Sequence, residues 1–146
     1  MLLSKSAEYG IRATLYLTSL KQEGYVSIRA ISDELGISFH FLTKIFQKLT
    51  LAGLLRSFRG PNGGVALARP ADQITLMDLV VALDGPALFT ECMLGLPGCG
   101  ERKPCPLHDA WRAERERLKT LFESTTLAAM VADFEAFDLR LKTVPS

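Results

Sequence analysis

Cys92, Cys99 and Cys105 are the only cysteines in the chain, and they lie close together in a segment rich in Gly and Pro. Glycine and proline favour turns, so this segment can fold as a loop around a small object. An odd number of cysteines argues against a framework of paired disulfides and favours reduced thiols that bind a metal. One disulfide with a spare thiol is the alternative. The grouping of these three cysteines therefore predicts a metal centre.

The possible metal centres depend on which residue supplies a fourth ligand beside the three cysteines. Iron-sulfur clusters usually need about four protein ligands, and histidine can replace cysteine. His108 follows Cys105 by about one helical turn, so both side chains can face one centre. Glu8 is the second candidate, because a dimer partner could bring it to the loop. A tetrahedral zinc ion would use the same three cysteines and His108, but the long open loop favours a larger iron-sulfur core.

The first half of the chain has the apolar spacing of three helices. The first is expected over 5–20 and the second from Ile28 to Leu35. Gly36 closes the second, and a third helix starts at Ile37-Ser38 and continues to Gly53. Ser4 and Ser27 are expected caps of the first and second helices, and Thr75 of a fourth helix over 76–83. Two short helices around a tight glycine turn predict a helix-turn-helix.

A β-hairpin is expected directly after the third helix. Leu54–Phe58 and Val65–Ala68 have strand character and flank the turn-forming stretch Arg59–Gly64. A hairpin at this position is a wing. The expected fold is therefore mainly α, a winged helix-turn-helix with a β-hairpin wing and a long C-terminal dimerisation helix.

The C-terminal segment combines dense charge with an apolar stripe on one long helix. The stripe comprises Leu107, Ala110, Trp111, Leu118, Leu121 and Phe122. Such a polar helix is expected to pack against a partner subunit through its stripe. Thr125-Thr126 interrupts it before a last helix. The expected organisation is a DNA-binding domain over 1–84, a cluster loop over 85–107, dimerisation helices over 108–142 and a disordered tail over 143–146.

The third helix is the expected recognition helix, because the second helix of a helix-turn-helix enters the major groove. Its candidate base or phosphate contacts are Ser38, Phe39, His40 and Thr43, with Lys44 and Lys48 as phosphate partners. Arg59 and Gly60 lie at the expected wing tip, where an arginine can enter a narrow minor groove. An ordinary solvated side chain is the alternative for each.

The charge is distributed unevenly along the chain. Residues 1–70 hold nine Lys and Arg against four Asp and Glu, and residues 71–146 hold eight against twelve. A basic first half suits a nucleic-acid partner, and an acidic second half suits association or sensing. No apolar run approaches the roughly 18 residues that a membrane span needs, so a cytoplasmic protein without membrane contact is expected.

Four motifs give the chain a resemblance to a known family. They are Ser32-x-x-Leu35-Gly36-Ile37-Ser38, Leu42-x-x-Ile45-Phe46-x-x-Leu49, Arg59-Gly60-Pro61-x-Gly63-Gly64, and the cysteines ending in Cys105-x-x-His108-x-x-Trp111. Together these motifs resemble the winged-helix family that includes IscR and NsrR, iron-sulfur-sensing bacterial repressors. The resemblance covers nearly the whole chain.

The resemblance implies a homodimer on a pseudo-palindromic site in double-stranded DNA. IscR-like members hold a 2Fe–2S cluster with three cysteines and a histidine at the place of His108. NsrR-like members hold a 4Fe–4S cluster completed by an acidic residue at the place of Glu8 in the partner. Six residues separate Cys92 from Cys99, one more than in IscR and NsrR.

The expected function is that of a DNA-binding transcriptional repressor, not an enzyme. An iron-sulfur cluster that responds to iron, nitric oxide, oxygen or redox state would set its operator affinity. The alternatives are a winged-helix protein with a structural zinc site and an iron-sulfur electron-transfer protein. No phosphate-binding loop or nucleophile-base pair in the sequence supports an enzyme.

Overall fold

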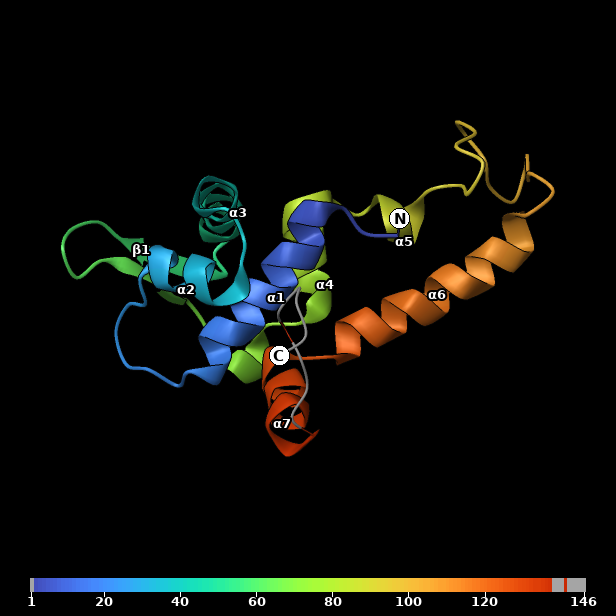
Figure 1. The fold of residues 1–146 in the computed structure, drawn as a ribbon. Helices are drawn as coiled ribbons and strands as arrows, with labels where there is room; N and C mark the ends of the chain where they lie inside the picture. Colours follow the sequence, from blue (N-terminus) through green and yellow to red (C-terminus); the bar gives the residue numbers. More distant parts are fainter. Residues whose placement is uncertain (1, 138–140, 142–146) are drawn as a thin grey trace.

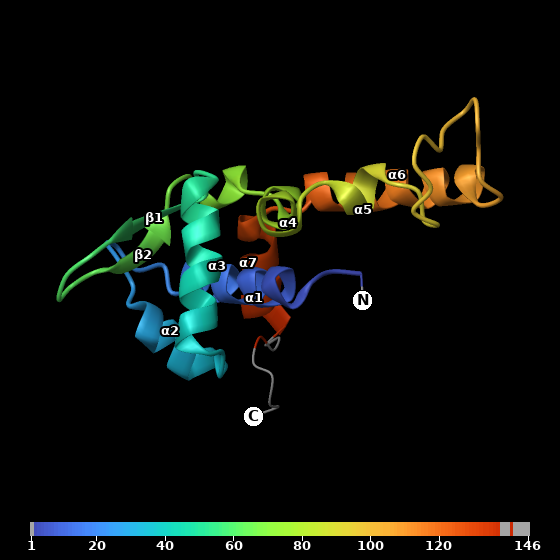
Figure 2. The ribbon, with the colours of Figure 1, turned by 90° about the horizontal axis from the view of Figure 1, so that it is seen from above.

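The computed structural model describes residues 2–137 and 141. It is elongated, with a helical body and hairpin at one end and an arm that carries the cysteine loop at the other (Figures 1 and 2). The expected tail over 143–146 lies outside the described residues, as do most residues after 137 of the expected dimerisation segment.

Helix α1 (Lys5–Ser19) lies at the centre of the body and packs against α4 (Leu76–Asp84), as Figure 1 shows. The hydroxyl of Ser4 accepts a hydrogen bond from the backbone N–H of Ala7, as expected of a cap. Gly10 allows the close approach, because a Cβ there would overlap the side chain of Leu83. The N-terminus of α1 is also tied to the end of α4, where Ser4 donates to the Asp84 carboxylate.

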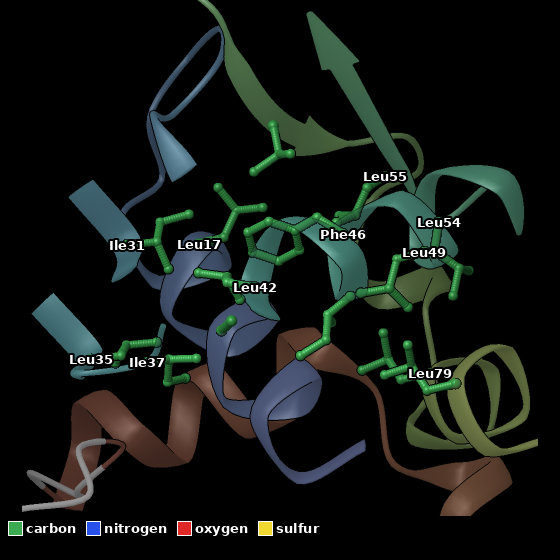
Figure 3. Packing of buried hydrophobic residues seen from close by; sticks show 14 of the residues in the cluster. Leu17, Ile31, Leu35, Ile37, Leu42, Phe46, Leu49, Leu54, Leu55 and Leu79 are labelled. Atoms are coloured by element: carbon green, nitrogen blue, oxygen red, sulfur yellow. The ribbon is translucent and has the colours of Figure 1, made fainter. Parts of the chain in front are cut away.

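The helix-turn-helix consists of α2 (Ile28–Leu35) and α3 (Phe39–Leu51). Gly36 ends α2 in the left-handed region at φ 69°, which glycine adopts without steric cost. Leu42, Phe46 and Leu49 of α3 are fully buried in the main hydrophobic cluster. Figure 3 shows Leu42 and Phe46 near Leu17 of α1 and Ile31 of α2, whereas Leu49 lies toward Leu79 of α4. This core fixes the orientation of α3.

The wing is an antiparallel pair of β1 (Leu55–Phe58) and β2 (Gly64–Leu67), with Leu55 opposite Leu67 and Phe58 opposite Gly64. Val65 also exchanges two backbone hydrogen bonds of 2.9 Å with Val26, which precedes α2. The wing is therefore attached to the helix-turn-helix on both sides. The sequence analysis predicted this hairpin but not the bridge to Val26.

Two short helical elements were not expected, namely the 3₁₀ turn η1 (Ala71–Gln73) and α5 (Ala87–Thr90). Each is only three or four residues long, too short to show a hydrophobic period. Thr75 caps α4 as predicted, and Asp78 completes a capping box that was not predicted. Helix α5 begins after Gly85-Pro86 and carries the buried Phe89, so the expected loop over 85–107 opens with a helical turn.

The arm is built on α6 (His108–Ser124), and α7 (Leu127–Phe137) returns to pack on α1. Part of the apolar stripe of α6 is used within the chain. Phe122 is buried against Val80 and Phe89, with the Phe89 and Phe122 ring centroids 5.2 Å apart. The expectation that the whole stripe faces a partner is thus incomplete, because α5 covers its C-terminal part. Leu121 remains 55% exposed.

A search of the described residues finds no helix both long and apolar enough to span a bilayer.

Candidate metal centre and DNA-binding surface

The cysteine loop lies at the far end of the arm, between α5 and α6 (Figure 2). Gly95 and Gly98 adopt φ values of 70° and 71°, and their turns are closed by hydrogen bonds from Gly95 N–H to the Cys92 carbonyl and from Cys99 N–H to the Leu96 carbonyl. No atom outside the neighbouring residues lies within 4 Å of a Cβ built at either glycine. These open turns bring the distant cysteines together.

The three thiol groups converge. The Sγ atoms of Cys92, Cys99 and Cys105 lie within 4.8 Å of one another, and none of the three cysteines is in a disulfide. Cys92 Sγ and Cys105 Sγ are 3.5 Å apart, and the backbone N–H of Cys105 donates to Cys99 Sγ at 3.4 Å. Three sulfur donors from one loop suit a thiophilic centre such as iron-sulfur or zinc.

His108 lies beside one of the three thiols. Its Nδ1 is 3.6 Å from Cys99 Sγ, and its Nε2 is buried with no hydrogen-bond partner. A buried imidazole nitrogen without a partner is costly. His108 is the first residue of α6, so the start of this helix places the imidazole ring beside Cys99. The chemistry of the four donors fits a thiolate- and imidazole-bound metal group.

The thiols differ in acidity. The pKa of Cys92 is lowered to about 7, chiefly because the backbone N–H of Leu96 donates to its thiolate, although burial acts in the opposite direction. Burial is the main cause that raises the pKa of Cys105. Since the thiolate is the metal-binding form, Cys92 is the more readily available donor near neutral pH.

Two side chains of α6 fix the start of the loop. Trp111 Nε1 donates to the Glu91 carbonyl at 3.0 Å, and Arg115 Nη1 donates to the carbonyls of Thr90 and Glu91 at 3.1 and 2.8 Å. These carbonyls directly precede Cys92. Both contacts hold Cys92 beside α6, which bears His108, and neither contact was predicted from the sequence.

Glu8 lies elsewhere within the chain. It is in the first turn of α1 and pairs with Lys5 at 3.2 Å, in the body rather than at the tip of the arm. The structure therefore does not bring Glu8 and the cysteines of one chain together. Its proposed role required a partner subunit, and that role stays a prediction.

Apart from Lys48, the predicted DNA-binding residues lie on the N-terminal part of α3 and at the wing. Ser38 caps α3 through the backbone N–H of Phe41, His40 is exposed, and the Thr43 hydroxyl donates to the Phe39 carbonyl at 2.8 Å. Lys44 is also exposed. The first turn of α3 thus offers polar groups to a groove.

A hollow of about 440 Å³ separates α3 from the wing. Phe39, Thr43, Arg59 and Gly60 line it, and so does Arg29 of α2, which the sequence analysis missed. The signal that could have found it is an arginine in the first turn of the helix before the recognition helix. The hollow gathers two arginines from different elements on the face formed by α3 and the wing.

Lys48 lies in the last turn of α3, as its place in the third helix implied. It lines a second hollow, of about 640 Å³, together with Ser4, Asp84, Cys92 and Trp111. This hollow lies between the N-terminus of α1, the end of α4 and the start of the cysteine loop. Lys48 therefore sits on the side of α3 that faces the arm, and its role as a phosphate contact remains a prediction.

Comparison with known proteins agrees with this architecture. The model of the family Rrf2, described as "Iron-dependent Transcriptional regulator", matches residues 3–133. The IscR regulator of Xenorhabdus nematophila is 34% identical over 139 residues, covering 95% of this chain and 84% of IscR. That of Photorhabdus laumondii is 32% identical over the same length, with the same coverage.

Solved structures give the same result for the fold. CymR, the global cysteine regulator of B. subtilis, superposes with a TM-score of 0.75 at 28% identity, covering 89% of this chain and 95% of CymR. IscR of T. potens also has a TM-score of 0.75 at 28% identity, covering 94% of this chain and 91% of that one. The winged-helix prediction is confirmed, and the relatives are regulators rather than enzymes, as expected. The chain belongs to the Rrf2 family of transcriptional regulators.

Proposed function

We propose that this transcriptional regulator is a repressor that binds a pseudo-palindromic operator as a homodimer, and that an iron-sulfur cluster held by Cys92, Cys99 and Cys105 sets its affinity. The observation that carries the proposal is the convergence of three Sγ atoms within 4.8 Å in a loop of a regulator fold. The similarity to IscR regulators over most of the chain supports it. A cytoplasmic location follows, since operators are reached there.

The DNA contacts follow from the exposed groups of α3 and the wing. Ser38, His40 and Thr43 would face base edges or phosphates, and Lys44 and Arg59 would neutralise phosphates or enter the minor groove. In a dimer, two copies of α3 would occupy successive major grooves about 34 Å apart. Residues 1–70 contain more Lys and Arg than Asp and Glu, which supports this surface as the one that contacts DNA.

Homodimerisation is supported by apolar groups left exposed on the arm. Met93, Leu94, Leu96 and Leu121 are each about half exposed, whereas most apolar side chains of this size in the body are buried. Three of these groups belong to the cysteine loop and Leu121 to the far end of α6, and exposed apolar groups of this kind are candidate interaction sites. A second copy would cover this surface and couple the cysteine loop to the relative placement of the two recognition helices.

The fourth ligand of the proposed cluster is His108. Its buried, unpartnered Nε2 and its Nδ1 near Cys99 support this choice over Glu8, which is paired with Lys5. When bound, the cluster supplies redox and ligand-exchange chemistry that responds to iron, oxygen or nitric oxide. The residues of the chain hold it, and Trp111 and Arg115 keep the loop against α6.

The choice between His108 and Glu8 as the fourth ligand leads to opposite predictions for their alanine variants. We expect His108→Ala to lower retention of iron and sulfide by about tenfold or more, because metal groups that lose a fixing residue lose affinity by such factors. We expect Glu8→Ala to retain both. Iron and sulfide counts and the visible spectrum of anaerobically purified protein provide the test. Loss of the chromophore in Glu8→Ala with retention in His108→Ala would assign the place to Glu8.

The experiment that tests the whole function begins with wild-type protein purified without oxygen. We expect matched iron and sulfide, and selection from a random duplex library should yield a palindromic site. Affinity for that site should fall by about a thousandfold between 50 and 200 mM salt if about six phosphates are neutralised. A protein that selects no sequence would refute the DNA-binding proposal.

A structural zinc ion is the second candidate for the centre. A tetrahedral ion with Zn–S bonds of about 2.3 Å places its sulfurs about 3.8 Å apart, and the Cys92–Cys105 Sγ distance of 3.5 Å suits it. Counts of zinc, iron and sulfide in the purified protein distinguish the zinc ion from the iron-sulfur cluster. One zinc per subunit without sulfide would leave a DNA-binding protein but remove iron-sulfur sensing.

A further inference from the structure

Arg29 and Phe39 form a pair that joins α2 to the first residue of the recognition helix. The guanidinium Cζ of Arg29 lies 4.0 Å from the centroid of the Phe39 ring. A guanidinium over an aromatic face is attracted by the ring quadrupole, and its side chain loses rotational freedom. The arginine is exposed, so the ring holds it while its donors remain open to solvent.

The pair stands at one side of the hollow between α2, α3 and the wing, and Arg59 lines the same hollow. Its polar lining groups include Ser27, Thr43 and Gln47, and none of its lining residues is acidic. Two arginines and no carboxylate give this hollow a positively charged lining, which suits an anion. The site lies beside the exposed first turn of α3, so the anion it would meet is the phosphodiester backbone of the DNA that α3 reads.

We propose that Arg29 binds a DNA phosphate and that Phe39 positions Arg29 instead of reading a base. This inference rests on the proposed DNA-binding function and deepens it. Phe39 is half-buried and has a second ring neighbour, His40, at 5.8 Å between centroids. The ring therefore supports two exposed polar side chains from within the protein surface.

Removal of the arginine gives the first test, by fluorescence anisotropy with the full-length, cluster-loaded protein. Arg29→Ala should weaken binding to the selected operator and to an unrelated duplex by similar factors, because a phosphate contact carries no sequence information. The slope of log affinity against log salt should become shallower by about 1.8 for the two contacts of a dimer. Arg29→Lys should keep the wild-type slope.

The matched control is Arg56→Ala. Arg56 is an exposed arginine of β1 that lines a separate hollow with Leu17 and Lys21, away from the hollow of Arg29. We expect it to leave the salt slope unchanged. If Arg29→Ala has the slope of Arg56→Ala and of the wild type, the phosphate contact is refuted. If the wild-type protein itself binds no duplex, the proposed function fails first.

A double-mutant cycle tests the role of Phe39. Phe39→Leu should weaken operator binding by about two- to fivefold, the range of an exposed cation–π pair, without changing the ranking of base-substituted operators. In the Arg29→Ala background the same change should have no further effect. An equal loss in both backgrounds, or a changed ranking, would show that Phe39 contacts DNA itself. Thermal midpoints of all variants confirm that each is folded.

Discussion

Cys105→Ser is expected to abolish the proposed cluster and to leave the fold intact. One of three converging sulfur donors is lost, and serine offers a weakly acidic hydroxyl in place of the thiolate that iron-sulfur clusters bind. The cysteines are absent from the main hydrophobic cluster, which is built from the body of the molecule. Iron and sulfide should therefore fall below about a tenth of the wild-type values, since the remaining donors cannot close the site.

The functional result of Cys105→Ser is a change in operator affinity of about five- to 150-fold, the range of typical coupling between two sites. Cys99→Ala and Cys105→Ala should behave alike and should remain folded dimers. Anaerobic binding isotherms with the wild type and each variant measure this coupling. Variants that lack the cluster but bind the operator as tightly as the wild type would refute control by the cluster.

Met93→Ala is the matched control for the cysteine variants. Met93 is also a sulfur-containing residue of the loop, but it is 54% exposed and is absent from the group of converging thiols. Iron and sulfide should remain at wild-type levels in this variant. An effect on dimer formation without an effect on iron would support the proposed dimer surface.

Gly64→Ala is expected to disrupt the wing and with it DNA binding. Gly64 has a φ of 153°, and a Cβ there would overlap the carbonyl oxygen of Val26. The two backbone hydrogen bonds between Val26 and Val65 would have to break or stretch. Strain in the left-handed region and two weakened hydrogen bonds together suggest a loss of about 3–4 kcal/mol in the free energy of unfolding.

Gly24→Ala is the control for Gly64→Ala, because it introduces backbone strain without steric overlap. Gly24 has a φ of 82°, but no atom outside the neighbouring residues lies within 4 Å of its Cβ position. We expect a loss of about 1 kcal/mol there, from backbone strain alone. Denaturant unfolding of both variants and operator affinity under native conditions form the test. Equal stability of the two variants would show that the bridge between the wing and Val26 does not depend on the glycine.

Local sequence signals predicted the helices and the wing because their causes are local. Ser4, Ser27 and Thr75 cap the helices that follow them, and each side chain accepts a hydrogen bond from a backbone N–H three residues later. Gly36 ends α2 in a left-handed turn as expected. Such signals involve neighbours within one turn of chain, so they need no knowledge of the tertiary fold.

The metal centre was predictable in composition but not in geometry. The spacing of Cys92, Cys99 and Cys105 marked them as candidate donors, whereas their approach to within 4.8 Å depends on the Gly95 and Gly98 turns and on α6. The contact of Arg115 with the carbonyls before Cys92 joins elements 24 or more residues apart. Sequence spacing carries no information on such contacts.

The sequence by itself determined the family, the order of the longer helices and the wing, and the candidate donors of a metal centre, because caps, turn glycines and motifs act over short range. Only the tertiary structure decided which side chains face one another. It buried Phe122 within its own chain, turned Lys48 toward the arm and placed Arg29 over Phe39. The physical reason is that the packing of α1, α3 and α4 sets the rotation of each helix, and the faces of neighbouring helices meet only after that packing.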